Sequence, residues 1–127
     1  MTTWLHRVAL LIALAIGPFA CVTPSVPIPP PSPEKIVFAL DVDTGSATFS
    51  YGPDASYAGA VVYVFNRDVG EGIITTAEGN GSVLESPPFP ALLGDEIVIT
   101  FETEAQLSST CVIIRDGQSS SGFECEQ

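Results

Sequence analysis

The sequence is poor in the residues that most often carry chemistry. It has 127 residues with a single histidine, tryptophan and methionine, and these are His6, Trp4 and Met1, all ahead of position 20. A chain without its first 20 residues has no imidazole for a Ser-His or Cys-His nucleophile or for the commonest zinc sites. We therefore expect a protein that is not an enzyme, with no catalytic residues, no metal ion and no cofactor.

Basic residues are also scarce. The chain has four Lys and Arg residues against 15 Asp and Glu. Only Lys35, Arg67 and Arg115 follow position 20, which gives residues 21–127 a formal charge of −12. Nucleic-acid recognition begins with clustered Lys and Arg, so we expect no nucleic-acid partner. The acidity itself favours solubility and self-repulsion and identifies no partner.

A hydrophobic run long enough to cross a membrane is missing too. The apolar run at residues 8–16 is followed by a Gly-Pro pair, whereas a transmembrane helix needs about 20 apolar residues. One cation, Arg7, precedes the run, and a small residue, Ala20, stands just before Cys21. A positive start, a short apolar core and a small residue at the cut describe a secretory signal.

The end of this segment resembles the signal of bacterial lipoproteins. In that family a cysteine directly after a small residue is diacylated, the leader is cut before it, and the new amino group is often acylated. Ala20-Cys21 matches the pattern, while Pro18 and Phe19 depart from it, because the family prefers an aliphatic and a small residue there. Plain secretion with cleavage after Ala20 and an uncleaved, unmodified Cys21 are the alternatives.

The lipoprotein resemblance implies a location. Fatty acyl chains such as palmitate on Cys21 would anchor the protein in a membrane, because two or more chains hold a protein where one does not. The expected location is the bacterial cell envelope. Val22 stands where some lipoproteins carry an acidic residue that retains them at the inner membrane, so the outer membrane is favoured.

The next stretch is rich in proline. Residues 22–33 contain six prolines in twelve positions. Proline fixes φ and removes backbone donors, which favours polyproline II. At ~3.1 Å per residue the stretch would form a spacer of roughly 35–40 Å; a proline-rich ligand for a groove is the alternative. The expected organisation is a signal segment at 1–20, a lipidated cysteine and linker at 21–33, and one domain at 34–127.

The remaining residues read as short strands. Apolar and polar residues alternate with period 2, and Gly, Asn, Asp and Pro separate the runs. Strands are expected at residues 36–42, 46–51, 59–65, 73–77, 82–85, 96–102, 110–115 and 122–126. The strand at 59–65 is apolar on both faces, as a covered central strand would be. The pattern predicts an all-β fold, a single small two-sheet antiparallel β-sandwich.

Three cysteines are an odd number for a secreted protein. Assigning Cys21 to lipid leaves Cys111 and Cys125 as a disulfide pair. A hairpin turn at 116–120 would place these two opposite each other, with Ile113 opposite Phe123. Closing such a loop contributes at most ~3 kcal/mol in the chain-entropy model. Two reduced, buried thiols are the alternative.

A second resemblance lies in the middle of the chain. Residues 60–65, 79–83 and 89–99 contain a glycine hairpin, a short strand, and a Gly-Asp turn that leads into an apolar strand. Over residues 58–102 the chain is similar to bacterial immunoglobulin-like modules of the carboxypeptidase-regulatory (transthyretin-like) type. The resemblance implies an accessory Ig-like β-sandwich without catalysis.

Asp43-Thr44-Gly45 is similar to the loop of aspartic proteases, in which two carboxylates share a proton. The chain contains this motif once, so activity would need a homodimer. Asp41 also stands where that family has an apolar residue. A small homodimeric aspartic-type protease that uses Asp43 is therefore the alternative function.

Two other binding functions deserve mention. The carboxylate pairs could bind Ca²⁺, which needs 6–8 oxygens from several loops, although acidic surface explains them as well; the pairs are Asp41/Asp43, Asp95/Glu96 and Glu102/Glu104. Sugars usually bind on aromatic platforms, for which the chain offers Tyr51, Tyr57 and Tyr63.

The leading prediction is a membrane-anchored, non-enzymatic envelope lipoprotein, structural, adhesive or accessory, with an unidentified envelope protein as partner.

Overall fold

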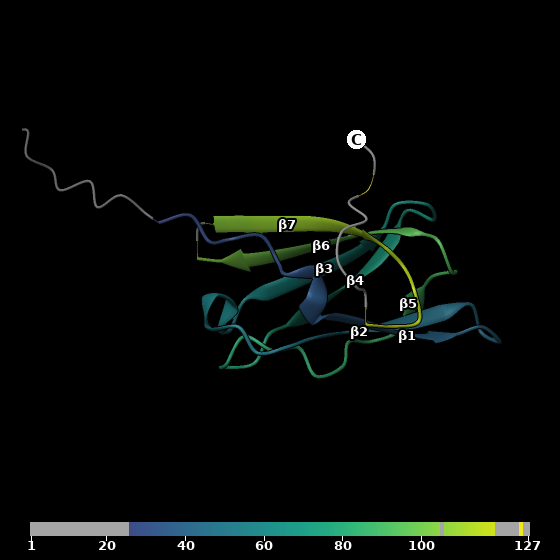
Figure 1. Cartoon of the computed structure of the whole chain (residues 1–127), viewed down its shortest axis with the longest axis horizontal. Coiled ribbons are helices and arrows are strands. Elements are labelled where there is room, and N and C mark those ends of the chain that lie inside the picture. The colour runs from purple at the N-terminus through teal and green to yellow at the C-terminus, as the bar shows by residue number, and fades with distance from the viewer. Residues whose placement is uncertain (1–25, 105, 119–124, 126–127) are drawn as a thin grey trace, which may run out of the picture.

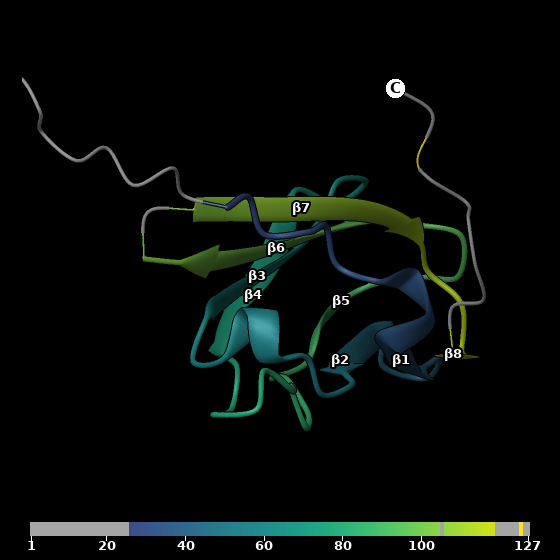
Figure 2. The same cartoon turned by 60° about the vertical axis from the view of Figure 1, so that its left-hand side comes forward.

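The structure is a computed structural model that describes residues 26–104, 106–118 and 125. It contains two four-stranded antiparallel sheets (Figures 1 and 2). The strands are β1 (Ile36–Asp41), β2 (Ser46–Tyr51), β3 (Val61–Asn66), β4 (Glu71–Thr76), β5 (Phe89–Pro90), β6 (Glu96–Thr103), β7 (Gln106–Ile113) and β8 (Gly117–Gln118). Two short 3-10 helices, η1 (Pro33–Lys35) and η2 (Ala55–Tyr57), complete the elements. The predicted all-β, two-sheet sandwich is confirmed, and it is compatible with an Ig-like fold.

Each sheet has a simple order. Sheet A runs β5-β2-β1-β8, and sheet B runs β4-β3-β6-β7. The β1–β2 hairpin pairs Ile36 with Tyr51, and β3 pairs with both β4 and β6. The alternation at 46–51 is confirmed, because Ala47, Phe49 and Tyr51 are buried while the residues between them are only half-buried.

The core between the sheets is centred on aromatic rings. Tyr57 stacks on Phe101 with ring centroids 4.2 Å apart, and Tyr51 lies 5.0 Å from Phe101. Tyr57 is placed by η2, whose N-terminus is capped by Asp54 through Oδ1, which accepts from the Ser56 N–H at 3.1 Å. Aromatic pairs at such distances add stability beyond the area that they bury.

Three sequence-based strand predictions need correction. The β3 strand is central in sheet B, but only its inner face, with Val62 and Val64, is buried; Phe65 on the outer face is exposed. Residues 82–85 form a single bridge, between Tyr51 and Val83, and no strand. The strand predicted at 110–115 begins earlier, at Gln106. In each case the residue pattern indicated β structure. It did not show which face is buried, which strand is the partner or where the pairing begins.

The chain after β7 also differs from the predicted hairpin. Instead of turning back onto β7, residues 117 and 118 form β8 beside β1, in the other sheet. Gly117 has a φ of +87°, which is strained for other residues and allows this change of direction. The predicted strand at 122–126 lies outside the described residues except for Cys125, and so does the pairing of Ile113 with Phe123.

The start of the described chain packs on the sandwich. Residues 26–32 run beside β7 in both views (Figures 1 and 2). The Gln106 side chain accepts from the Ile28 N–H at 3.0 Å and donates to the Val26 carbonyl at 3.2 Å. The Pro29 carbonyl accepts from the hydroxyls of Tyr57 and Ser108. This part of the proline-rich stretch is therefore docked on the domain, whereas a free spacer was predicted.

Proline explains why side chains make these contacts. A proline-rich segment lacks most of the backbone donors that a sheet ladder uses, so Gln106 and Ser108 of β7 bond to its remaining polar groups. Ile28 packs against the core, and Pro31 is buried. The segment thus packs along β7 through side-chain contacts.

Candidate functional site

An exposed surface of the described sandwich lies along β4. This strand ends sheet B, so one side of its backbone faces β3 and the other faces outward. No side-chain hydrogen bond is found on residues 71–76 within the described part of the chain, and no loop there bonds to their backbone. We call this outward side of residues 71–76 the β4 edge.

Beside the β4 edge is an apolar depression on the outer face of sheet B. It has a volume of about 390 Å³ and is lined by residues of β3 and β4, among them Tyr63, Phe65, Gly72 and Ile74. Tyr63 pairs with Ile74 across the two strands, and Phe65 pairs with Gly72. Because Gly72 has no side chain, the Phe65 side chain has no cross-strand neighbour at its paired position on β4, although it pairs with Val98 on β6. We call these four residues the β4 patch.

Gly72 is required by close packing of the backbone. A Cβ added there would collide with the carbonyl oxygen of Val64 and come within 2.9 Å of the Phe65 Cα. The strand pair is therefore tight at this point, and the depression above Gly72 is built into the fold. A glycine inside a strand often marks such a close approach.

The surroundings of the β4 edge are acidic. Asp68 and Glu71 are exposed at one end and Glu78 at the other. Arg67, the basic residue nearest in the chain, is engaged elsewhere, because its Nη1 lies 3.4 Å from Oε2 of Glu96 on β6. Negative charge therefore frames an apolar centre.

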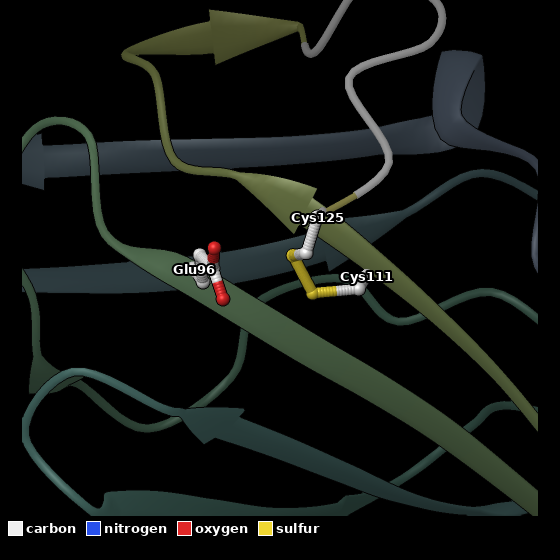
Figure 3. A group of neighbouring side chains, drawn as sticks. All are labelled: Glu96, Cys111 and Cys125. Carbon is white, nitrogen blue, oxygen red and sulfur yellow. A yellow bond between two sulfur atoms is a disulfide. The ribbon is translucent and has the colours of Figure 1, made fainter. Parts of the chain in front are cut away.

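The predicted disulfide between Cys111 and Cys125 is confirmed, with Cα atoms 5.5 Å apart. It fastens Cys125 to β7, and the Glu96 carboxylate lies beside it (Figure 3). Among the described residues this trio is the one cluster of three or more potential metal ligands. Two sulfurs joined to each other are not thiolates and do not act as metal ligands in the usual way. The cluster is therefore a disulfide with a neighbouring carboxylate.

Cys21, the predicted lipid-attachment residue, lies outside the described residues. No helix of the described chain is long and apolar enough to cross a bilayer.

Asp43 lies exposed in the turn between β1 and β2. The turn is organised by Asp41, whose Oδ1 accepts from the backbone N–H of Asp43 at 3.0 Å and of Thr44 at 3.3 Å. Gly45 has a φ of +65° and closes the turn. The Asp-Thr-Gly sequence thus has a structural explanation as a hairpin turn, and an aspartic-protease pair would require the Asp43 of a second copy.

The other carboxylate pairs have separate surroundings. Asp95 accepts from the Asn66 amide at 2.8 Å, whereas Glu96 pairs with Arg67. Glu102 accepts from the Tyr63 hydroxyl at 2.9 Å, and this bond raises the pKa of Tyr63. None of the three predicted pairs gathers a third carboxylate among the described residues.

The three tyrosines do not form a sugar-binding platform. Tyr51 and Tyr57 are buried in the core, and only Tyr63 reaches the surface. Burial raises the pKa of Tyr51 to about 12 and also raises that of Tyr57. Their hydroxyls hold the N-terminal segment, because Tyr51 accepts from the Ser32 N–H at 2.9 Å and Tyr57 donates to Pro29.

An ion pair near Tyr51 also helps to hold the N-terminal segment. Lys35 forms an ion pair with Asp54, with Nζ 3.1 Å from Oδ2. Burial alone would raise the pKa of the Asp54 carboxyl, but the hydrogen bonds from Lys35 and Ser56 outweigh it and the pKa is lowered. These contacts hold η1 against the N-terminus of η2, which carries Tyr57.

No family model, curated protein or solved structure matches the chain. The site must therefore be judged from its own geometry. Sequence reasoning missed the β4 edge, and the available signal was a six-residue strand without proline or lysine.

Proposed function

We propose that this chain is a non-enzymatic lipoprotein of the bacterial cell envelope, in which a lipid-anchored Ig-like sandwich acts as an accessory binding module. The observation that carries the proposal is the spacing between Cys21 and the packed chain. Ala20-Cys21 ends a short apolar run, and Val26, five residues after the cysteine, is already bonded to β7 through Gln106. A lipid on Cys21 would thus be attached closely to a folded domain.

This spacing suggests how the domain would sit. If Cys21 is in the headgroup region, the five residue steps from Cys21 to Val26 allow a separation of roughly 15 Å at ~3.1 Å per residue. The β6–β7 hairpin, which adjoins Val26 through Gln106, would then be the end nearest the bilayer. The β4 strand would remain accessible along the side of the domain.

The accessory role is supported by the kind of surface that the sandwich presents. The β4 patch is apolar and open, whereas the carboxylates that could serve catalysis lie in turns or pair with other side chains. Asp43 lies in an exposed hairpin, so the aspartic-protease alternative gains no support from its position. An exposed apolar surface rimmed by polar residues is typical of protein–protein contacts.

Membrane extraction of the native protein tests the anchor. We expect the protein to stay with envelope membranes through a high-salt wash, to leave in mild detergent, and to yield an N-terminal peptide that carries acyl chains on Cys21. A Cys21→Ser variant should be found in the soluble fraction or keep its leader. Release by salt together with an unmodified N-terminal mass would contradict the proposal.

A further inference from the structure

We propose that the β4 edge binds an extended segment of a positively charged partner protein, which adds to sheet B as a fifth strand. The inference deepens the accessory-binding part of the proposed function, and it does not depend on the lipid anchor. It assigns the binding surface and the chemistry of what binds there.

The first argument compares the four sheet edges of the described sandwich. In sheet A the edge strands β5 and β8 are two residues long, and β5 contains Pro90. In sheet B residues 26–32 pack along β7 through the side chains of Gln106 and Ser108. Short edge strands, proline and covering segments are established ways of preventing edge-to-edge pairing. The β4 edge is the remaining one. Strand β5 lies close to β4, but no backbone hydrogen bond joins the two among the described residues, and β4 is six residues long without proline.

The second argument is the chemistry of β4 itself. An antiparallel strand directs alternate pairs of backbone N–H and C=O groups to each side, so half of those on β4 point away from β3. The strand reads Glu71, Gly72, Ile73, Ile74, Thr75, Thr76. It has no proline to remove a donor and no lysine to repel a neighbouring strand. Such an edge provides the main-chain bonds for strand addition.

The third argument concerns side chains. On the outer face an added strand would place alternate residues next to Gly72 and Ile74. A bulky residue opposite Gly72 would extend over the depression and contact Phe65, which is 43% exposed. Cross-strand contacts between aromatic and β-branched residues stabilise a sheet by roughly 0.2–1 kcal/mol per pair. The β4 patch therefore favours an apolar residue at that position.

Charge decides between a second copy and a different protein. Residues 21–127 carry a formal charge of −12, and Asp68, Glu71 and Glu78 stand at the ends of β4. Two copies joined through β4 would bring these acidic ends together. A segment flanked by Lys or Arg would instead be attracted, which raises its association rate and selects against acidic sequences.

A designed peptide tests the proposal on the full purified chain. The probe is a peptide of ten alternating valine and threonine residues with two further lysines at each end. A matched peptide carries glutamates in place of the lysines. We expect the lysine peptide to bind and to slow hydrogen exchange at alternate amides of residues 71–76, with β7 unchanged. The glutamate peptide should bind at least about tenfold more weakly, and salt should reduce this difference.

Two lysine substitutions on the same sheet provide the control. Ile74 on β4 is 65% exposed and Leu107 on β7 is 67% exposed. Ile74→Lys should weaken binding of the lysine peptide at least about tenfold, because a lysine on an edge strand repels an incoming basic strand. Leu107→Lys adds the same charge at equal exposure and should leave affinity within about twofold. Thr76→Lys serves as a second β4 variant if Ile74→Lys unfolds the protein.

The alternative outcomes are distinct. Equal binding of both peptides, or equal effects of Ile74→Lys and Leu107→Lys, would overturn the proposal. Concentration-dependent dimerisation that protects residues 71–76 without peptide would assign the edge to a second copy and overturn the choice of partner. The absence of any protection at 71–76 would overturn the docking site itself. None of these results affects the mass of the N-terminal peptide, so failure here is separable from failure of the lipid anchor.

Discussion

The two outer strands of sheet B, β4 and β7, differ in what packs against them. Residues 26–32 cover β7 and bond to it through Gln106 and Ser108, and the disulfide fastens Cys125 to it. The β4 edge has neither, although β4 has six residues available for pairing. Because an uncovered edge risks aggregation, the difference between the two strands is the basis of the binding role proposed for β4. The following predictions test this difference, beginning with the largest expected effect.

Removing the disulfide should destabilise the region around β7. The bridge closes a sequence separation of 14 residues, for which the chain-entropy model gives a loss of at most about 3 kcal/mol in the free energy of unfolding. A Cys111→Ala/Cys125→Ala variant should show this loss in chemical denaturation. Hydrogen exchange should accelerate more on β7 than on β4. A variant as stable as the parent would show that the bridge has no stabilising role.

Gly72→Ala should destabilise the packing of β4 against β3. The added Cβ would collide with the Val64 carbonyl, and we expect a loss of about 1–3 kcal/mol, typical of overpacking. Gly79→Ala is the matched control, because a Cβ there meets no atom within 4 Å and should change stability by less than about 0.5 kcal/mol. Thermal unfolding measures both. Equal effects would show that the strand pair is not tight at Gly72.

Alkaline pH should weaken the packing that holds the N-terminal segment over β7. Burial raises the pKa of Tyr51 to about 12, above its unfolded value near 10. The unfolded chain therefore loses this proton first, and stability falls as pH rises from about 10 to about 12, by roughly 1–2 kcal/mol. Unfolding measured across this range should show the decline, and Tyr51→Phe should reduce its slope. An unchanged slope in that variant would exclude Tyr51 as the cause.

Gln106→Ala should loosen the N-terminal segment from β7. Its effect on stability should be the smallest of those predicted here. It removes two partly exposed hydrogen bonds to the segment, to Ile28 and Val26, and we expect a loss of about 1 kcal/mol. Residues 26–28 should become more accessible to proteolysis and hydrogen exchange. Ser109→Ala, which removes only a contact with Thr100 on β6, is the control. Unchanged protection of 26–28 would mean that the packing of Ile28 and the bonds to Pro29 hold the segment without Gln106.

Local sequence patterns predicted much of the fold correctly. The alternation at 46–51 indicated β2 with its buried face, because period 2 is imposed by strand geometry. The Asp-Thr-Gly and Gly-Asp stretches indicated turns, because glycine permits positive φ. The cysteine count indicated the Cys111–Cys125 pair. These inferences depend on properties of residues and their near neighbours.

What the sequence alone determined was therefore the class of fold, most of the strands, the disulfide and the acidic character. Only the tertiary structure decided that β8 joins β1 in the other sheet, that Phe65 stays exposed on a central strand, and that the proline-rich segment covers β7 while β4 stays open. The reason is physical. Period and turn chemistry act over a few residues, whereas which edge is covered depends on contacts such as Gln106 with Ile28, 78 residues apart in the chain.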